Sequence, residues 1–475
     1  MALVESGASH ELSAYQLECE RRGVVDVASL IQNPVWEPRY GEYDRDNQLV
    51  KLDMLVGLVR MFDEGRHSDS PEFRTDIEKT ANFINHSFDM YEGKEAPADQ
   101  GSFGFVVPTR VNRMDWDYSQ EVDDHFPILK YVDVATRQLM LVGMCPFVID
   151  TYGKSPDGKR GYMIFAPLFE NMIKGSEADP NKGDIANGME MIGVLDKVIN
   201  DTARFAKERL GIPVIGLGAI LPRITDFGRM IKEDIGVYTT TGHAGTVALI
   251  GETLKRADRE GYVKGGLEKV GFIGSGAIGM ATAEMFLREG TNSITISDRD
   301  KGRLGGVVAT LQELYPNAKI VGTLDNAEVL ANNNAVVSAI TTKLNLDDAP
   351  YKHIDLDGKL ILDDSQPGCF EPEELEARGA NLVWPIGTDG TVGGYVTRGI
   401  FDYQGTGPAS RSDVWGCEAE VAAIAFTGEY SKRLTDQATP EDAFAIKALC
   451  DQVDLRVARL QRMGTYLEDI KNPVA

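Results

Sequence analysis

Hydrophobic and polar positions follow a regular order between residues 269 and 385, where short apolar runs are separated by longer segments with apolar residues at helical spacing. Short apolar runs predict strands, and apolar residues three or four apart predict amphipathic helices. Strands that alternate with helices are typical of a parallel sheet covered on both faces. The predicted strands are 269–274, 293–298, 318–323, 335–340, 359–364 and 381–385, and the predicted helices are 277–290, 301–315 and 326–333. We therefore expect an α/β fold with a Rossmann-like, doubly wound parallel sheet.

A second α/β segment precedes this one. Two β-like runs, 139–152 and 160–172, are separated by Pro156-Asp157-Gly158, which is a hairpin signal. A predicted helix at 189–210, a strand at 213–221 and a helix at 246–261 follow. This order predicts a β-rich piece that leads into βα units.

The two ends of the chain are less regular. Residues 1–135 show charged helical stretches at 49–64 and 75–91, and the C-terminal part predicts helices at 419–434 and 441–467. At 475 residues the chain exceeds the roughly 250 to 300 residues of a single core. The expected domains are an N-terminal extra region or cap (1–135), a substrate-binding α/β domain (136–256), a Rossmann dinucleotide-binding domain (257–408) and C-terminal helices that pack back on the substrate domain (409–475).

Composition excludes several classes of protein. The 43% hydrophobic and 26% charged content is that of a globular protein, and no apolar run reaches the ~18 residues that span a bilayer. The N-terminus lacks the basic start and apolar core of a signal peptide. The net charge of -24 argues against nucleic acid as the main partner. Five cysteines without a CxxC pair suggest reduced thiols in a cytoplasmic protein and no metal site, whereas the oligomeric state stays unknown.

The clearest motif is a GxGxxG fingerprint directly after the strand 269–274. Its first glycine allows a tight turn, its second lets the backbone approach a pyrophosphate, and its third lets helix and strand pack closely. An acidic residue ends the next strand about 20 residues later, as this fingerprint requires. We therefore predict a dinucleotide site formed by Gly274, Ser275, Gly276, Ala277, Ile278, Gly279 and Asp298, with Thr240 as a further contact.

The choice of nicotinamide cofactor stays open. Asp298 is suited to accept the two ribose hydroxyls of NADH. Arg299, Lys301 and Arg303 follow at once and are suited to pair with the 2′-phosphate of NADPH. A solvated turn also explains exposed charges of this kind.

Cys417 is the candidate nucleophile, because it stands at the opening of the predicted C-terminal helix. A thiolate accepts an acyl group from a thioester, and the new thioester is electrophilic enough to take a hydride and release an aldehyde. A helix N-terminus favours the thiolate, but Glu418 and Glu420 oppose it. Among the other cysteines, Cys145 and Cys450 fit a core and Cys369 is the only rival.

Two further residues are candidates for catalysis. His243, in the Gly-rich loop 239–246, is a candidate general acid, although helix capping explains it equally well. Glu420 lies one helical turn past Cys417 and is placed to orient the thiol or a proton donor, although a glutamate in a first turn is favoured by the helix dipole alone. Other loop residues predicted at the mouth of the sheet are Ser365, Gln366, Asp389 and Thr391.

The order of these motifs is similar to that of a known family. TTTGHAGTVALIGETLKRA, the glycine fingerprint, ISDRDKGRL, GTDGTVGG and finally WGCEAEVAAIAF resemble the long-chain fatty acyl-[acyl-carrier-protein] reductases of cyanobacteria over roughly residues 140–430. The resemblance implies NADPH-dependent reduction of an acyl thioester, delivered by acyl carrier protein or coenzyme A, to an aldehyde. In that family a Cys-x-x-Glu motif carries the acyl group, and here the matching residues are Cys417 and Glu420.

This sequence also departs from the family. Residues 1–130 have no obvious counterpart, the family's Gly-Asn-Thr-His-Thr loop is matched only loosely around His243, and Asp298 stands where the family tends to have a small neutral residue. Lys154, Lys159 and Arg160 form a weak basic patch for a phosphopantetheine carrier. The acyl group is not predicted.

Two other functions remain open. One is a non-covalent NAD(P)-dependent dehydrogenase of a small hydroxy or amino acid, similar to shikimate dehydrogenase or ornithine cyclodeaminase, which would not need Cys417. It would need a Lys-Asp or Lys-Asn pair in the substrate half, and no convincing pair is visible. The other is a cofactor-binding regulatory protein, which the gathering of motifs at one predicted sheet edge disfavours.

Overall fold

The structure is a computed structural model. It describes residues 14–27, 29–37, 39–97, 101–109, 125–152, 160–169, 185–340, 342–365, 368–389, 410, 412–430, 434–462 and 464–471. The chain divides into two compact units. The first consists of 1–95, 109–147 and 166–198, and the second consists of 96–108, 148–165 and 199–475. The four-domain division expected from the sequence stays a prediction.

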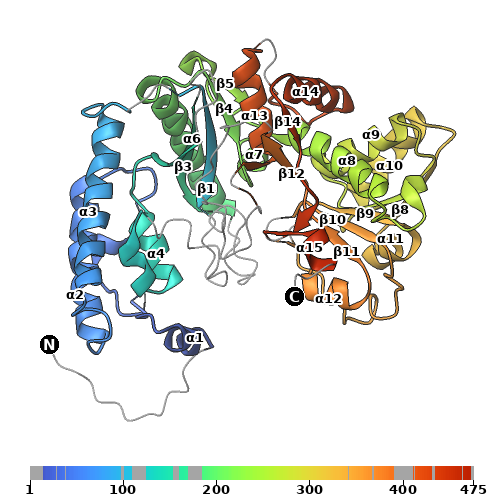
Figure 1. The fold of residues 1–475 in the computed structure, drawn as a ribbon. Helices are drawn as coiled ribbons and strands as arrows, with labels where there is room; N and C mark the ends of the chain where they lie inside the picture. The colour runs from blue at the N-terminus through green and yellow to red at the C-terminus, as the bar shows by residue number, and fades with distance from the viewer. Residues whose placement is uncertain are drawn as a thin grey trace. The chain divides into compact units, whose positions relative to one another are not determined.

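The first unit is mainly helical (Figure 1). Its two longest helices, α2 and α3, pack against each other and begin at side-chain caps: Asp44 accepts from the Asn47 amide and Ser70 from the Phe73 amide. Gly93, in the left-handed region, ends α3. The elements are α1 (Ala14–Arg22), a 3-10 turn (Pro34–Trp36), α2 (Arg45–Phe62), α3 (Pro71–Glu92), a second 3-10 turn (Pro127–Tyr131) and α4 (Val134–Leu141).

A buried lysine fixes the end of α4. The Lys51 ammonium donates to the carbonyls of Leu139 (3.0 Å) and Val142 (2.8 Å), and its side chain is 1% exposed. Burial lowers the pKa of Lys51 to about 8. The prediction of a β-like run from residue 139 is therefore wrong at its start, because the helix continues to Leu141 and the strand begins only at Phe147.

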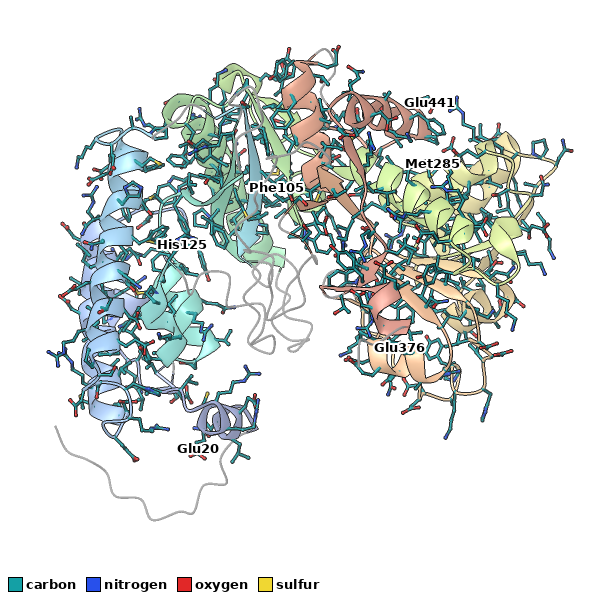
Figure 2. The ribbon with its side chains drawn as sticks, in the orientation of Figure 1. Glu20, Phe105, His125, Met285, Glu376 and Glu441 are labelled. Atoms are coloured by element: carbon teal, nitrogen blue, oxygen red, sulfur yellow. The ribbon has the colours of Figure 1, made fainter. Side chains whose placement is uncertain are left out.

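A five-stranded sheet precedes the glycine fingerprint in the chain. Its strand order is β2-β3-β1-β4-β5, and β1, β4 and β5 run parallel. Figure 2 labels Phe105 on β1. An added Cβ on Gly218 would come within 2.6 Å of the Phe105 ring, so glycine permits this contact. The strands are β1 (Phe103–Thr109), β2 (Phe147–Tyr152), β3 (Gly161–Phe169), β4 (Val214–Leu217) and β5 (Tyr238–Thr240).

The six-stranded sheet confirms the predicted fold class. Its order is β11-β10-β9-β6-β7-β8, and every neighbouring pair is parallel, which is the doubly wound arrangement. The strands are β6 (Lys269–Ile273), β7 (Ser293–Ser297), β8 (Lys319–Thr323), β9 (Ala335–Ser338), β10 (Leu360–Asp363) and β11 (Asn381–Val383). The connecting helices are α9 (Ala277–Arg288), α10 (Lys301–Leu314), α11 (Asn326–Asn332) and α12 (Pro372–Ala377).

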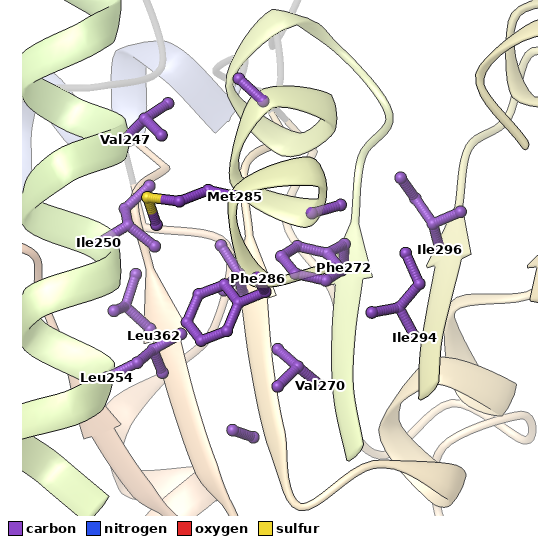
Figure 3. Packing of buried hydrophobic residues seen from close by; sticks show 14 of the residues in the cluster. Val247, Ile250, Leu254, Val270, Phe272, Met285, Phe286, Ile294, Ile296 and Leu362 are labelled. Atoms are coloured by element: carbon purple, nitrogen blue, oxygen red, sulfur yellow. The ribbon is translucent and has the colours of Figure 1, made fainter. Parts of the chain in front are cut away.

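Helix α8 (His243–Arg259) follows β5 and covers part of the six-stranded sheet. Figure 3 shows Val247, Ile250 and Leu254 on α8 beside Met285 of α9 and Leu362 of β10. Met285 packs where a Cβ on Gly251 would lie 2.3 Å from its Cε, so this glycine permits the close contact. The core of the six-stranded sheet therefore includes a helix that begins at the five-stranded sheet.

The C-terminal part differs from its prediction. Helix α13 (Gly416–Thr427) ends at Gly428, whose φ of 72° stops it earlier than residue 434. Helix α14 (Pro440–Gln452) begins at a Thr439–Asp442 capping box and does not continue to residue 467. Asp454, at φ 58°, breaks the helix, and the next residues form β14. The predicted long helix is therefore wrong, because β pairing outweighs its helical periodicity.

Strand β14 (Leu455–Val457) joins a small antiparallel sheet of order β13-β12-β14, with β12 (Ile386–Asp389) in the middle and β13 (Asp413–Trp415) leading into α13. The remaining elements are α6 (Ile185–Arg204), a π turn (Phe205–Arg209), α7 (Leu221–Ile224), 3-10 turns (Glu233–Ile235 and Gly266–Glu268), β15 (Gln461–Arg462), β16 (Thr465–Tyr466) and α15 (Leu467–Lys471). Within the described ranges no helix is long and apolar enough to cross a membrane.

Candidate functional site

The glycine fingerprint has the geometry that a bound pyrophosphate requires. Gly274 has φ 103°, and a Cβ there would lie 2.7 Å from the Ala339 carbonyl. A Cβ on Gly279 would lie 1.9 Å from the Gly274 carbonyl, so only glycine lets α9 start this close to β6. Gly276 faces open space, with nothing within 4 Å of an added Cβ. The loop therefore leaves the backbone at Gly276 accessible at the N-terminus of α9, where amides and the helix dipole attract phosphate.

Ala277 and Ile278 form the first turn of α9 and are half-buried beside this open side, whereas Ser275 is buried. These residues fit a dinucleotide. When bound, a nicotinamide cofactor supplies a hydride, and the loop residues would hold its pyrophosphate.

Asp298 binds the glycine loop. One carboxylate oxygen accepts from the Ser275 amide (3.1 Å) and hydroxyl (2.7 Å), and the other accepts from the Asp300 amide (2.9 Å). Burial raises the pKa of Asp298, but the hydrogen bonds from Asp300 and Ser275 and the nearby Arg303 outweigh it and hold the pKa below its ordinary value. Asp298 is therefore an anion that locks the loop.

The basic residues after β7 are exposed. Arg303 lies 3.5 Å from the Asp298 carboxylate, and Arg299 and Lys301 extend into solvent on the same turn. Both the acceptor for NADH and the cations for NADPH are thus present, so the geometry leaves the choice of cofactor open.

The N-termini of α8 and α13 meet at three glycines. A Cβ on Gly242 would lie 2.2 Å from Cβ of Cys417, and a Cβ on Gly245 would lie 2.3 Å from the Gly416 carbonyl. On the other side, a Cβ on Gly416 would lie 2.5 Å from Cα of Thr246. The backbones are in contact, so the loop 239–246 and Cys417 share one place in the fold.

Glu420 joins these two helices. Its carboxylate accepts from the amides of Gly242 (3.1 Å) and Gly245 (2.6 Å) and from the Thr240 hydroxyl. The N-cap residue of α8 has no side chain, so Glu420 supplies from α13 the acceptor that the first turn of α8 requires. Burial raises the pKa of Glu420 to about 7, against the opposing effect of these amides. Thr240, predicted to contact the cofactor, donates its hydroxyl to this carboxylate.

Cys417 is the second residue of α13 and is partly accessible. It packs against the apolar group of Ile386, Trp415 and Ala458, against which Trp384 also packs. Burial, and after it the charges of Glu418, Asp364 and Glu420, raise the pKa of the Cys417 thiol above its ordinary value. The helix N-terminus does not offset these acids, so the resting sulfur is a thiol.

His243 follows Gly242 and begins α8. Its Nδ1 is buried and has no hydrogen-bond partner among the described residues, and its ring makes an edge contact with Phe227 at 5.8 Å. Burial lowers the pKa of His243 to about 4, so the imidazole is neutral near pH 7. A neutral imidazole can donate one hydrogen bond and accept another, but it lacks the second proton that an imidazolium would supply as a general acid.

The carboxyl ends of β9 and β10 hold a buried polar group that contains the rival cysteine. The Cys369 sulfur lies 2.7 Å from the Ser338 hydroxyl, and its amide donates to Asp363 (2.8 Å). Ser365 donates its amide to the same carboxylate (3.0 Å). Burial, followed by the charge of Asp363, raises the pKa of Cys369 well above its ordinary value. This cysteine is 1% exposed and belongs to the buried core at the carboxyl edge of the six-stranded sheet.

Asp364 is a site residue that sequence reasoning missed. It follows β10, its amide donates to the Ser338 carbonyl (2.9 Å), and its charge acts on Cys417. The only sequence signal is its place in the loop after a strand.

Among the other candidates, Cys145 is buried and Cys450 is half-buried, with its pKa raised to about 12 by burial. Gln366, Thr391, Lys154 and Lys159, and the side chain of Asp389, lie outside what the structure describes.

Comparison with known proteins gives one family match. The model for NADP oxidoreductases, coenzyme F420-dependent, matches residues 269–365, which run from β6 past β10. No curated protein matches the chain. Together with the loop geometry, the match makes this range the nicotinamide-binding part of an NAD(P)-dependent oxidoreductase.

Solved structures show weaker likenesses. A dipicolinate synthase subunit from Bacillus halodurans is 13% identical with a TM-score of 0.26, and the alignment covers 40% of this chain and 60% of that one. Quinate dehydrogenase from Corynebacterium glutamicum, in complex with NAD, is 14% identical with a TM-score of 0.31 and coverage of 74% and 100%. Shikimate 5-dehydrogenase from Listeria monocytogenes, in complex with shikimate and NAD, is 13% identical with a TM-score of 0.30 and coverage of 75% and 98%. Likenesses this weak transfer no substrate or mechanism.

Proposed function

We propose that this protein is an NAD(P)H-dependent reductase that converts an acyl thioester to an aldehyde through an acyl group held on Cys417. The observation that carries the proposal is the place of Cys417: at a helix N-terminus, against Gly242 of α8, and packed on the apolar group of Ile386, Trp415 and Ala458. Ile386 of that group stands three residues after the end of β11, which supports a position of the thiol near the carboxyl edge of the sheet that carries the glycine loop. Ligands of doubly wound sheets bind at that edge.

The residues divide the work as follows. Cys417 attacks the thioester carbonyl, and the carrier thiol leaves with the proton of Cys417. Glu420 holds the ends of α8 and α13 together, and His243, the first residue of α8, is a neutral hydrogen-bonding group next to Gly242. The acyl donor is acyl carrier protein or coenzyme A, which share the phosphopantetheine thiol.

Mass spectrometry tests the covalent step without a cofactor. Incubation with acyl-coenzyme A esters of four to sixteen carbons should add one acyl group to Cys417. Cys417→Ser should abolish both the adduct and aldehyde formation, whereas Cys450→Ser, which changes a half-buried thiol of α14, should keep them. Full turnover by Cys417→Ser would exclude the covalent mechanism.

A second candidate is a non-covalent NAD(P)-dependent dehydrogenase of a small hydroxy or amino acid. The raised pKa of the Cys417 thiol, caused by burial and then by Glu418, Asp364 and Glu420, favours it because a thiol is a poor nucleophile. Turnover of such an acid by Cys417→Ser would establish this candidate.

A further inference from the structure

The segment after β9 lies directly against the glycine loop. The Ala339 amide donates to the Ile273 carbonyl (2.9 Å), so the pairing of β9 with β6 continues one residue past the end of β9. A Cβ on Gly274 would lie 2.7 Å from the Ala339 carbonyl and 2.9 Å from Cγ2 of Ile340. The first glycine of the fingerprint is therefore packed against Ala339 and Ile340.

This segment stands where the strand order of the six-stranded sheet reverses. The chain passes from β6 to β7 and β8 on one side, whereas β9, β10 and β11 lie on the other side of β6. Dinucleotides bind across the crevice at such a point. Asp298 follows β7 and Ile340 comes after β9, so the two residues flank the loop after β6 from opposite sides. With the adenosine ribose on the Asp298 side, the nicotinamide half of the cofactor belongs on the Ile340 side.

A buried serine holds this segment in place. The Ser365 hydroxyl oxygen accepts from the Ile340 amide (3.2 Å) and lies 3.5 Å from the Ser338 hydroxyl. Ser365 is 5% exposed, whereas Ile340 is half-buried. Because Ser365 comes two residues after the end of β10, its hydroxyl joins the loops that follow β9 and β10.

Ser365 is itself fixed by Asp363. One oxygen of the Asp363 carboxylate accepts from the Ser365 amide (3.0 Å), and the other accepts from the Cys369 amide (2.8 Å). Asp363 is the last residue of β10 and is 1% exposed. Hydrogen bonds of this kind hold a supporting side chain in one position. The core of the sheet therefore fixes the Ile340 amide through Ser365.

We infer that Ser365 is a positioning residue for the nicotinamide half of the cofactor: its hydroxyl fixes the Ile340 amide and thereby the peptide that lies against Gly274. Without this hydroxyl the amide loses its acceptor, and a backbone amide without a partner turns toward another one. The peptide between Ala339 and Ile340 would then leave its place beside the glycine loop. The inference goes beyond the proposed function, because it concerns the cofactor and holds for both candidate reactions.

Ser365→Ala tests the inference in calorimetric titrations of the full-length protein. The probes are NADH with ADP-ribose, and NADPH with 2′-phospho-ADP-ribose. Each ADP-ribose keeps the adenosine, the pyrophosphate and the second ribose but lacks the nicotinamide. Ser365→Ala should bind the reduced cofactor about tenfold more weakly than wild type, as expected for one lost hydrogen bond. It should bind the matching ADP-ribose with unchanged affinity, which also shows that the variant folds.

Ser338→Ala is the matched control. Ser338 is 0% exposed and its hydroxyl lies 2.7 Å from the Cys369 sulfur, but the Ile340 amide donates to Ser365. This variant should keep the wild-type ratio of the two affinities. Hydrogen exchange followed by mass spectrometry is the second readout: without ligand, the Ile340 amide should exchange faster in Ser365→Ala and at the wild-type rate in Ser338→Ala.

Several results would overturn the inference. Equal weakening of cofactor and ADP-ribose binding in Ser365→Ala would show a purely structural role of the hydroxyl. The same change of ratio in Ser338→Ala would assign the effect to the buried polar group as a whole. Unchanged affinities in Ser365→Ala, or unchanged exchange at Ile340, would exclude the residue from positioning the cofactor. The titrations contain no acyl donor, so their outcome is independent of the proposed reaction.

Discussion

Gly245→Ala should destabilise the contact between α8 and α13, although alanine is the better helix former. The new Cβ would lie 2.3 Å from the Gly416 carbonyl and 2.7 Å from Cβ of Glu420. Overpacking of this kind costs about 1–3 kcal/mol. The gain from glycine to alanine inside a helix is about 1 kcal/mol and offsets part of that cost.

Gly305→Ala is the matched control. Gly305 also lies inside a helix, α10, and has nothing within 4 Å of an added Cβ, so the variant should gain the same ~1 kcal/mol. Helix propensity then cancels between the two variants, and Gly245→Ala should be less stable than Gly305→Ala by about 1–3 kcal/mol in urea unfolding followed by tryptophan fluorescence.

A second readout connects the contact to the site. Separation of the two helix ends should expose Cys417, so alkylation by iodoacetamide at that residue should be faster in Gly245→Ala and unchanged in Gly305→Ala. Equal stability of the two variants within about 0.5 kcal/mol, together with equal alkylation rates, would refute the close packing of α8 on α13.

Three other predictions concern titrating groups. Burial lowers the pKa of Lys51 from 10.5 to about 8, so the folded state binds fewer protons than the unfolded state between these pH values. The free energy of unfolding should therefore rise between pH 8 and 10.5 by on the order of 3 kcal/mol. Lys51→Met should remove that rise in urea titrations. Burial raises the pKa of Glu420 from 4.5 to about 7, so its contribution to the free energy of unfolding is complete below pH 4.5 and is lost as pH rises through 7. Glu420→Gln should flatten this fall in the free energy of unfolding, and an unchanged slope against pH would contradict the prediction. Asp298→Asn should improve the affinity for NADPH relative to that for NADH by about tenfold in calorimetric titrations, because the anion no longer repels a 2′-phosphate. An unchanged ratio of the two affinities would show that Asp298 does not select the cofactor.

The sequence predicts the doubly wound sheet well, because its strands are short apolar runs and helices join most of them, two of which begin at the side-chain caps Asp300 and Asp325. The fingerprint glycines are predicted for the same reason: their roles depend on a strand, a turn and a helix that are contiguous in the chain. Local signals fail after residue 452, where the helical spacing continues but β14 pairs with β12, more than 60 residues earlier in the sequence. Strand pairing of this kind leaves no periodic trace.

The junction of α8 and α13 could be predicted only in part. The cysteine at a helix start is visible in the sequence, but the partner of Glu420 is not, because Gly242 and Gly245 lie about 175 residues away. Asp364 was missed for a related reason: the sequence does not show that an aspartate after β10 acts electrostatically on a thiol more than 50 residues later.

The acids around Cys417 therefore differ in what they do. Glu420 accepts from amides at the positive end of α8, so much of its charge is compensated there, although it remains among the groups that raise the pKa of the thiol. Burial, and after it the charge of Asp363, raises the pKa of Asp364 well above its ordinary value. A site that keeps its sulfur as a thiol is poor at generating a free thiolate. The slow step we expect in such a reductase is therefore acylation of Cys417, and single-turnover kinetics should show adduct formation slower than its reduction.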